Sequence, residues 1–141
     1  MSEENKNLVR RWFEEVWNQG RLSAIDELFD RSGKAYGWPD PDRPISSPEE
    51  FAAACKTYRE AFPDIHMTVD DLVAEGDKVA VRWTATMTHL GNSLGFPASA
   101  KKARLSGSSF LTCGKGRILN GWNYMDLTRL HLELQDKLDM L

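Results

Sequence analysis

The sequence predicts an α+β domain, with helices in the first half of the chain and antiparallel strands in the second. Up to about residue 62, apolar side chains recur at intervals of three and four, the period of an amphipathic helix. From residue 65 the period changes to two, which is typical of half-buried strands. Because 141 residues fit one hydrophobic core, we expect a single domain over residues 1–141.

Two helices open the predicted fold. Residues 3–18 have a broad apolar face, made by Leu8, Val9, Trp12, Phe13, Val16 and Trp17. Asn18 to Gly20 supply the stop. A short helix follows from Ser23, which can cap it, and the segment from Asp30 to Lys34 breaks that helix.

A broken loop and a third helix come next. Residues 35–47 hold three prolines and a glycine, too many for regular structure, and they carry Tyr36 and Trp38. Ser47 then provides an N-cap, followed by a proline and two acids, and a helix begins there. Pro63 ends it.

Four strands are predicted after this helix. They cover residues 65–74, 78–90, 102–113 and 117–126, with turns at 75–77 and 113–116. The last segment, 127–141, places leucines at helical spacing, at positions 127, 130, 134 and 138. It is either a terminal helix or a tail that docks on a partner subunit.

The composition excludes several classes of partner. The chain has 18 basic and 21 acidic residues, a net charge of -3 and no basic stripe, so we expect no nucleic acid partner. No apolar signal region and no run of about 18 apolar residues occurs, so we expect no membrane partner and a cytoplasmic protein. Cys55 and Cys113 lack metal-ligand spacing and are interpreted as reduced, buried thiols.

Three phrases in order carry a family resemblance: NLVRRWFEEVWNQGRLSAIDELFD, then YREAFPDIHMTVDDLVAEGDKVAVRWTATMTHLG, then GRILNGWNYMD. In them the sequence resembles the SnoaL-like polyketide cyclase family of the NTF2-like superfamily. The resemblance implies a cone-shaped α+β barrel, with three N-terminal helices packed on a curved antiparallel sheet around a deep cavity. It also implies a homodimer.

The resemblance further implies a reaction. Named family members close polyketide rings by an intramolecular aldol step, with an aspartate as acid and base and no metal or cofactor. That aspartate follows the tryptophan of the last strand by four positions, which is Asp126 here. Many relatives carry an aspartate directly after this tryptophan, where this chain has Asn123. An amide can donate a hydrogen bond to a carbonyl but cannot exchange a proton at neutral pH.

Asp126 and His89 are the candidate catalytic residues. In an extended strand Asp126 shares an apolar face with Ile118, Trp122 and Tyr124, so it is either a buried functional group or the cap of the terminal segment. Burial would raise its pKa and suit it to proton transfer. His89 could polarise a carbonyl or orient Asp126; alternatively it is a strand-end histidine bonded to backbone or water.

The candidate ligand-binding residues are mostly aromatic, since flat rings suit a planar ligand. They are Trp38, Tyr36, Trp83, Met87, Phe110, Trp122 and Asn123. We place Tyr36 and Trp38 at the cavity mouth, and Trp12 and Trp17 in the core. No histidine has a metal-like partner at strand or helix spacing, so we expect no metal site.

These observations leave three functions open. The first is a cofactor-independent cyclase or isomerase acting on a small ketone-bearing or polyketide-like molecule. The second is a non-catalytic dimer of the same fold that binds a small organic molecule. The third is hydration or hydrolysis by a water that Asp126 activates.

Overall fold

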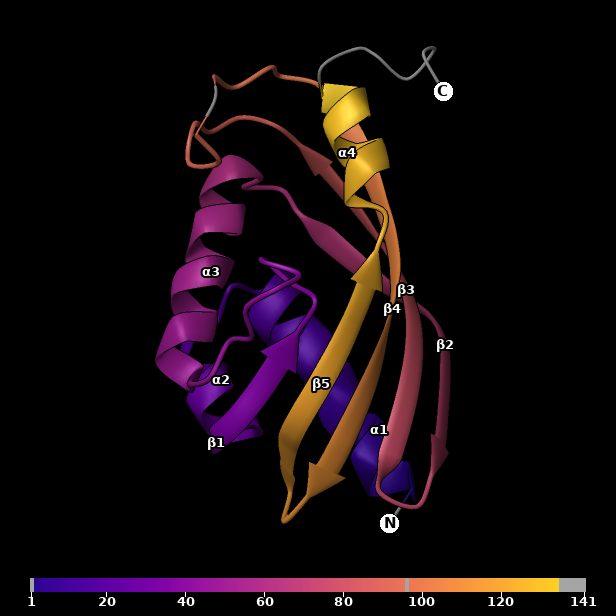
Figure 1. Ribbon diagram of the computed structural model, residues 1–141. Helices are drawn as coiled ribbons and strands as arrows, with labels where there is room; N and C mark the ends of the chain where they lie inside the picture. Colours follow the sequence, from indigo (N-terminus) through magenta and orange to yellow (C-terminus); the bar gives the residue numbers. More distant parts are fainter. Residues whose placement is uncertain (1, 96, 135–141) are drawn as a thin grey trace.

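The computed structural model describes residues 2–95 and 97–134. Its helices are α1 (Ser2–Arg11), the π-helix η1 (Trp12–Asn18), α2 (Ser23–Leu28), α3 (Pro48–Ala61) and α4 (Leu127–Leu134). Its strands are β1 (Phe29–Tyr36), β2 (His66–Glu75), β3 (Lys78–Thr88), β4 (Lys102–Gly114) and β5 (Arg117–Met125). The predicted order, helices before the antiparallel strands, is confirmed (Figure 1).

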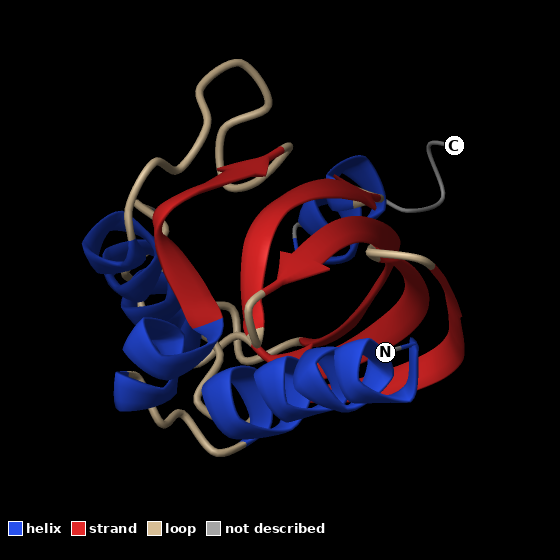
Figure 2. Ribbon diagram, turned by 90° about the horizontal axis from the view of Figure 1, so that it is seen from below, coloured by secondary structure: helices blue, strands red, loops and turns tan. Residues whose placement is uncertain are grey.

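One mixed sheet carries the fold, with strand order β1-β5-β4-β3-β2. The pairs from β5 to β2 are antiparallel, and β1 lies parallel to β5. Figure 2 shows the strands bent into an open curl, with the N-terminal helix lying across its inner side. In Figure 1, α3 flanks the same space. The core therefore lies between the concave face of the sheet and the helices.

Strand β1 corrects the sequence prediction. The segment from Asp30 to Lys34 was expected to break a helix and lead into a loop, yet it lies within an eight-residue strand. The strand pairs irregularly with β5, with a register shift between Phe29 and Lys34. Its local sequence is polar and carries no strand signal, so the pairing depends on the edge that β5 offers rather than on propensity. The predicted cap at Ser23 is also wrong, since Leu22 occupies that position and makes no side-chain cap bond.

Helix η1 differs from the continuous α-helix expected over residues 3–18. From Trp12 the helix widens to π geometry, in which bonds join residues five apart. The bond from the Gln19 amide to the Glu14 carbonyl, 2.9 Å long, shows this spacing. Because residues five apart then stack on one face, Trp12 and Trp17 are both buried on the inner side.

A β-bulge at Leu119 reverses the predicted faces of β5. Thr112 pairs with Asn120 and Cys113 pairs with Ile118, which leaves Leu119 without a partner across the ladder. One extra residue shifts the alternation, so the strand no longer keeps every second side chain on the face of Ile118. Asn123 therefore faces the core, and Trp122 lies on the outer face, 37% exposed.

The capping prediction for the third helix is confirmed, and the described part of the last segment, Leu127–Leu134, is a helix. Ser47 accepts a hydrogen bond from the Glu50 amide at 3.1 Å, and Pro48 begins α3. Helix α4 packs on β4 and buries Leu130 and Leu134, so these leucines are not a docking surface for a partner. Leu138 lies outside the described residues. Within the described ranges, no helix is long and apolar enough to cross a membrane.

Candidate ligand cavity

A cavity lies between the helices and the concave face of the sheet. The cavity volume is about 60 Å³. Its lining is predominantly apolar and aromatic, and consists of Trp12, Phe13, Trp17, Phe29, Ala35, Trp38, Phe51, Tyr58, Ile65, Met67, Trp83, Leu105, Ser109, Leu111, Ile118, Gly121, Asn123 and Met125. Since a cavity that takes up benzene is about 150 Å³, even a ligand of one ring requires lining side chains to move.

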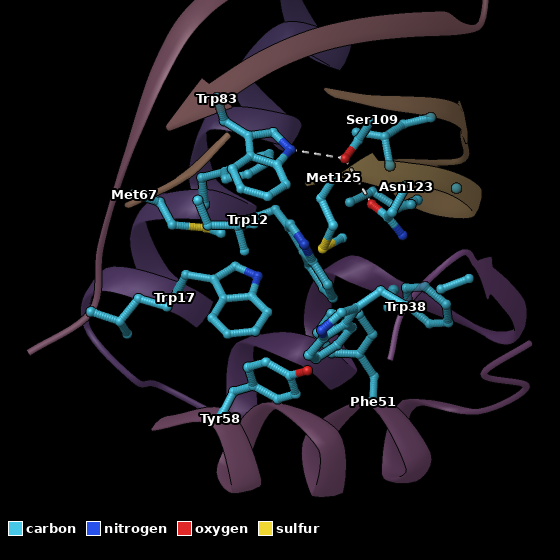
Figure 3. A pocket seen from close by; sticks show the side chains of 18 residues that line it. Trp12, Trp17, Trp38, Phe51, Tyr58, Met67, Trp83, Ser109, Asn123 and Met125 are labelled. Atoms are coloured by element: carbon cyan, nitrogen blue, oxygen red, sulfur yellow. Dashed lines mark hydrogen bonds between the residues drawn. The ribbon is translucent and has the colours of Figure 1, made fainter. Parts of the chain in front are cut away.

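The helical side of the cavity is a set of aromatic rings in edge-to-face contact. Trp17 and Trp38 lie 5.3 Å apart between ring centroids, and Trp38 and Tyr58 lie 5.0 Å apart. Trp12 packs against Phe51 at 4.8 Å. Such tilted contacts are favoured by the ring quadrupoles and hold each ring in place (Figure 3). The helical wall is thus pre-formed from η1, α3 and the loop after β1.

The sheet side carries a chain of polar side chains, drawn in Figure 3. The Trp83 indole donates to the Ser109 hydroxyl at 3.1 Å, and Ser109 donates to the Asn123 amide oxygen at 2.7 Å. The Asn123 amide nitrogen donates to the Tyr36 carbonyl at 3.1 Å. Trp83 and Ser109 are almost fully buried, so each of these bonds replaces one to water.

Two glycines make this polar chain possible. A Cβ at Gly107 would sit 2.5 Å from the Trp83 ring, so the missing side chain leaves room for the indole. A Cβ at Gly37 would overlap the carbonyl oxygen of Asn123, and Gly37 also has a φ of +86°. Both positions require glycine for close approach.

Tyr58 is the single ionisable side chain among the described lining residues. Burial raises the pKa of its phenol, and a hydrogen bond from Trp38 opposes that rise. The phenol is therefore a neutral hydrogen-bonding group at physiological pH. The lining, as far as the structure describes it, contains no carboxylate, imidazole, ammonium or guanidinium group.

Three of the predicted ligand-binding residues line the cavity, and four do not. Trp38, Trp83 and Asn123 contribute to the lining. Met87 is buried but borders a separate surface hollow near Lys102.

The other three predicted ligand-binding residues lie on the outer face of the sheet. Tyr36 stacks on Trp122 with ring centroids 5.1 Å apart, and Phe110 is 52% exposed. Tyr36 was placed at the cavity mouth because its loop looked irregular, but it ends β1 with its ring turned outward.

His89 lies outside the cavity lining and is fully buried. Its Nδ1 accepts a hydrogen bond from the Ser99 amide at 3.1 Å, and the centroid of its ring lies 5.6 Å from that of the Phe62 ring. Its backbone amide donates to the Lys101 carbonyl. This geometry fastens the loop after β3 to the end of that strand, and it matches the backbone-bonded alternative. The catalytic role of His89 stays a prediction.

Asp126 is exposed and also lies outside the cavity lining. Its carboxylate accepts a hydrogen bond from the Arg129 amide at 2.9 Å, and its own amide donates to the Ser106 carbonyl. The position is that of an N-cap for α4. This is the second of the two alternatives that the sequence left open, and the catalytic role of Asp126 stays a prediction.

Sequence reasoning missed four of the side chains that shape the cavity. Trp12 and Trp17 were predicted to lie in the core, and they do, but they also line the cavity. Tyr58 and Ser109 were not among the predicted ligand-binding residues. An available signal was the placement of one serine within the apolar phase of strand 102–113.

Within residues 2–95 and 97–134, no three His, Cys, Asp or Glu side chains lie close enough to hold a metal ion.

Comparisons with known proteins identify the family and the fold. The family model described as SnoaL-like polyketide cyclase matches residues 7–134. No curated protein matches the chain.

Solved structures share the fold over nearly the whole chain. A candidate SnoaL-like polyketide cyclase from Jannaschia sp. CCS1 is 21% identical, with a TM-score of 0.85, covering 94% of this chain and 92% of its own. A candidate polyketide cyclase from Acidithiobacillus ferrooxidans is 27% identical, with a TM-score of 0.80 and coverage of 95% and 96%. AclR, a candidate hydroxylase from Streptomyces galilaeus, is 25% identical, with a TM-score of 0.84 and coverage of 96% and 83%. The chain belongs to the SnoaL-like polyketide cyclase family, with the NTF2-like cone fold.

Proposed function

We propose that this protein binds a small, neutral, ketone-bearing molecule of polyketide type in the cavity and promotes its aldol closure or isomerisation without a cofactor. One observation carries the proposal: the Trp83–Ser109–Asn123 chain brings a hydrogen-bonding amide to the wall of an otherwise apolar, aromatic cavity. A pocket of this kind binds the ring system by its apolar walls and orients it by few polar contacts. The family resemblance supports the polyketide class.

The chemistry follows from where charge develops. Removing a proton between two carbonyls moves negative charge onto a carbonyl oxygen, and an N–H donor fixed in a dry cavity stabilises that charge more strongly than water does. Asn123 supplies such a donor. The methylene of a β-diketone is already acidic, so a weak base suffices: a water molecule that enters with the ligand can take up its proton once the oxygen is held, and return it to the product. Asp126 stays the candidate for a proton carrier inside the protein.

A non-catalytic binding protein is the second candidate. It is favoured by one specific observation: no carboxylate or imidazole belongs to the described cavity lining. In this case the cavity holds the same class of neutral ketone and does not convert it. One of the structural neighbours is named a hydroxylase and others are named cyclases, so the fold alone does not choose the reaction.

Deuterium uptake by methylacetylacetone, a small neutral β-diketone, separates the two candidates. Wild-type protein is expected to bind it, detected by NMR, and to accelerate exchange of its central hydrogen. In Asn123→Ala the acceleration should fall by about tenfold to a hundredfold, since one oxyanion donor is worth at most about 10² to 10³. Asn7→Ala, at an exposed position, is the matched control.

Binding without acceleration would support the non-catalytic candidate. Absence of binding, by this diketone and by the single-ring ketone cyclohexanone, would contradict the cavity as the ligand site.

A further inference from the structure

We propose that Trp83 and Ser109 are positioning residues that lock the Asn123 amide with an N–H facing the cavity, so that the site selects neutral ligands with a hydrogen-bond acceptor. This inference rests on the proposed function and specifies its ligand class. It follows from the direction of each hydrogen bond in the chain of three side chains.

The direction of each of these hydrogen bonds is fixed by the two end groups, the Trp83 indole and the Tyr36 carbonyl. An indole N–H can only donate, so the Ser109 oxygen must accept from Trp83. A backbone carbonyl can only accept, so the Tyr36 oxygen must receive an N–H, and the Asn123 group facing it is the nitrogen. The Asn123 oxygen therefore faces Ser109 and accepts a hydrogen bond from that hydroxyl. Neither the amide nor the hydroxyl can turn round without breaking two bonds.

One hydrogen of the Asn123 amide remains for a ligand. Its nitrogen carries two, and one is used by the Tyr36 carbonyl. The described residues provide no second hydrogen-bond acceptor for this nitrogen, and Asn123 belongs to the cavity lining. Figure 3 shows the amide oxygen turned toward Ser109 and the nitrogen turned away from it. The side chain is thus held as a donor.

A second donor lies on the helical side. The Tyr58 phenol belongs to the cavity lining, and its hydroxyl can donate a hydrogen bond to a ligand. No charged side chain belongs to the described lining, so an ionised ligand would lose its hydration without compensation. The matching ligand is neutral and carries a carbonyl.

A matched pair of probes tests this selection: cyclohexanone and methylenecyclohexane, which have nearly the same shape and differ in C=O against C=CH₂. Wild-type protein is expected to prefer the ketone by about fivefold to tenfold, as one buried hydrogen bond contributes. In Ser109→Ala the preference should fall toward one, while affinity for methylenecyclohexane stays within twofold. Ser108→Ala, the neighbouring residue on the outer face, is the matched control.

An NMR measurement on wild-type protein keeps the proposal testable if Ser109→Ala unfolds. Of the two Asn123 side-chain amide hydrogens, one should shift with cyclohexanone and neither with methylenecyclohexane. Equal binding of the two probes, or a ketone preference that survives Ser109→Ala, would overturn the positioning role while leaving the cavity as the ligand site. If cyclohexanone, methylenecyclohexane and methylacetylacetone all fail to bind, the proposed function itself is contradicted.

Discussion

At position 123 the difference between an amide and a carboxylate decides what the cavity can do. The amide satisfies Ser109 with its oxygen and the Tyr36 carbonyl with its nitrogen. A carboxylate could still accept from Ser109, but its second oxygen would face the Tyr36 carbonyl, acceptor against acceptor. Only the protonated acid would restore that bond. The residue therefore favours carbonyl binding over proton exchange.

Asn123→Asp should accordingly give an aspartate with a pKa well above the ordinary value of about 3.9. A carboxyl group whose pKa is raised on folding binds more protons in the folded state, so stability is greater below about pH 4 and is lost as pH rises. Urea unfolding should show a larger loss of stability at pH 7 than at pH 4, relative to wild type. An equal loss at both pH values, as expected for Asn7→Asp, would contradict this.

The two cysteines are expected to be chemically silent. Burial raises the pKa of the Cys55 thiol to about 12 and that of Cys113 to about 11. Because both thiols stay protonated in the folded state, they contribute stability that is present below about pH 9 and is lost as pH rises toward 11 to 12. A thiol reagent at pH 8 should label neither cysteine until denaturant unfolds the chain; rapid labelling of native protein would refute the burial.

Asp126 can be tested as a cap and as a proton carrier in one pair of variants. Asn is as good an N-cap as Asp, so Asp126→Asn should change the free energy of unfolding by only a few tenths of a kcal/mol, whereas Asp126→Ala should cost about 1 kcal/mol. If Asp126 also carries the proton, both variants lose the exchange of methylacetylacetone. If it is only a cap, exchange in Asp126→Asn equals that of wild type.

At the level of elements, the end of β1 is held against β5 by a contact that only glycine permits. Asn123 donates a hydrogen bond to the Tyr36 carbonyl, and its own carbonyl lies close against Gly37. Trp38, the next residue along the chain, belongs to the cavity wall. The geometry of one loop therefore sets the position of both a donor and a ring. A chain with any side chain at position 37 must move β1 or β5.

Gly37→Ala should destabilise the protein by about 2 kcal/mol or more, since it combines a positive φ with overlap on the Asn123 carbonyl. Gly76→Ala is the matched control, with a φ of +59° and open space around it, and should cost about 1 kcal/mol. Thermal unfolding measures both. Equal costs would show that the contact with β5 contributes nothing.

For the whole molecule, the outer face of the sheet presents an aromatic patch formed by Tyr36, Phe110, Trp122 and Tyr124. Phe110 and Tyr124 are 52% and 59% exposed. The ring centroids of Tyr36 and Trp122 lie 5.1 Å apart, and those of Phe110 and Tyr124 lie 6.2 Å apart. Patches of this kind mark protein interfaces more often than scattered apolar residues do. With the dimer that the family resemblance implies, we propose that a second copy of the chain covers this patch.

Phe110→Lys should shift sedimentation from dimer to monomer at micromolar concentration, because it places a charge in the buried centre of the interface. Val73→Lys replaces a side chain on β2 that is 63% exposed, somewhat more than Phe110, and should leave the dimer intact. A wild-type chain that sediments as a monomer at high concentration, or a Phe110→Lys dimer, would reject the proposal.

Much of the fold was predictable because its elements have strong local signals. The Ser47–Pro48 cap, the end of α3 before Pro63 and the four antiparallel strands agree with the structure to within one or two residues. Strand β1 was not predictable, since a polar segment gains strand structure only from its neighbour. Of the predicted ligand-binding residues, Trp38, Trp83 and Asn123 lie in the cavity lining, and their role in binding stays a prediction.

The sequence by itself determined α3, the four antiparallel strands and the family, because period, caps and turn residues act over a few positions. Tertiary structure alone decided which side chains meet in the cavity. The π geometry at Trp12 and the bulge at Leu119 each rotate the following residues by a fraction of a turn, and neither has a local signature here. The first lets Trp12 and Trp17 line the cavity together, and the second brings Asn123 inward and sends Trp122 outward. The chemistry of the cavity follows from those two shifts, since a one-residue change in alternation exchanges the faces of a strand.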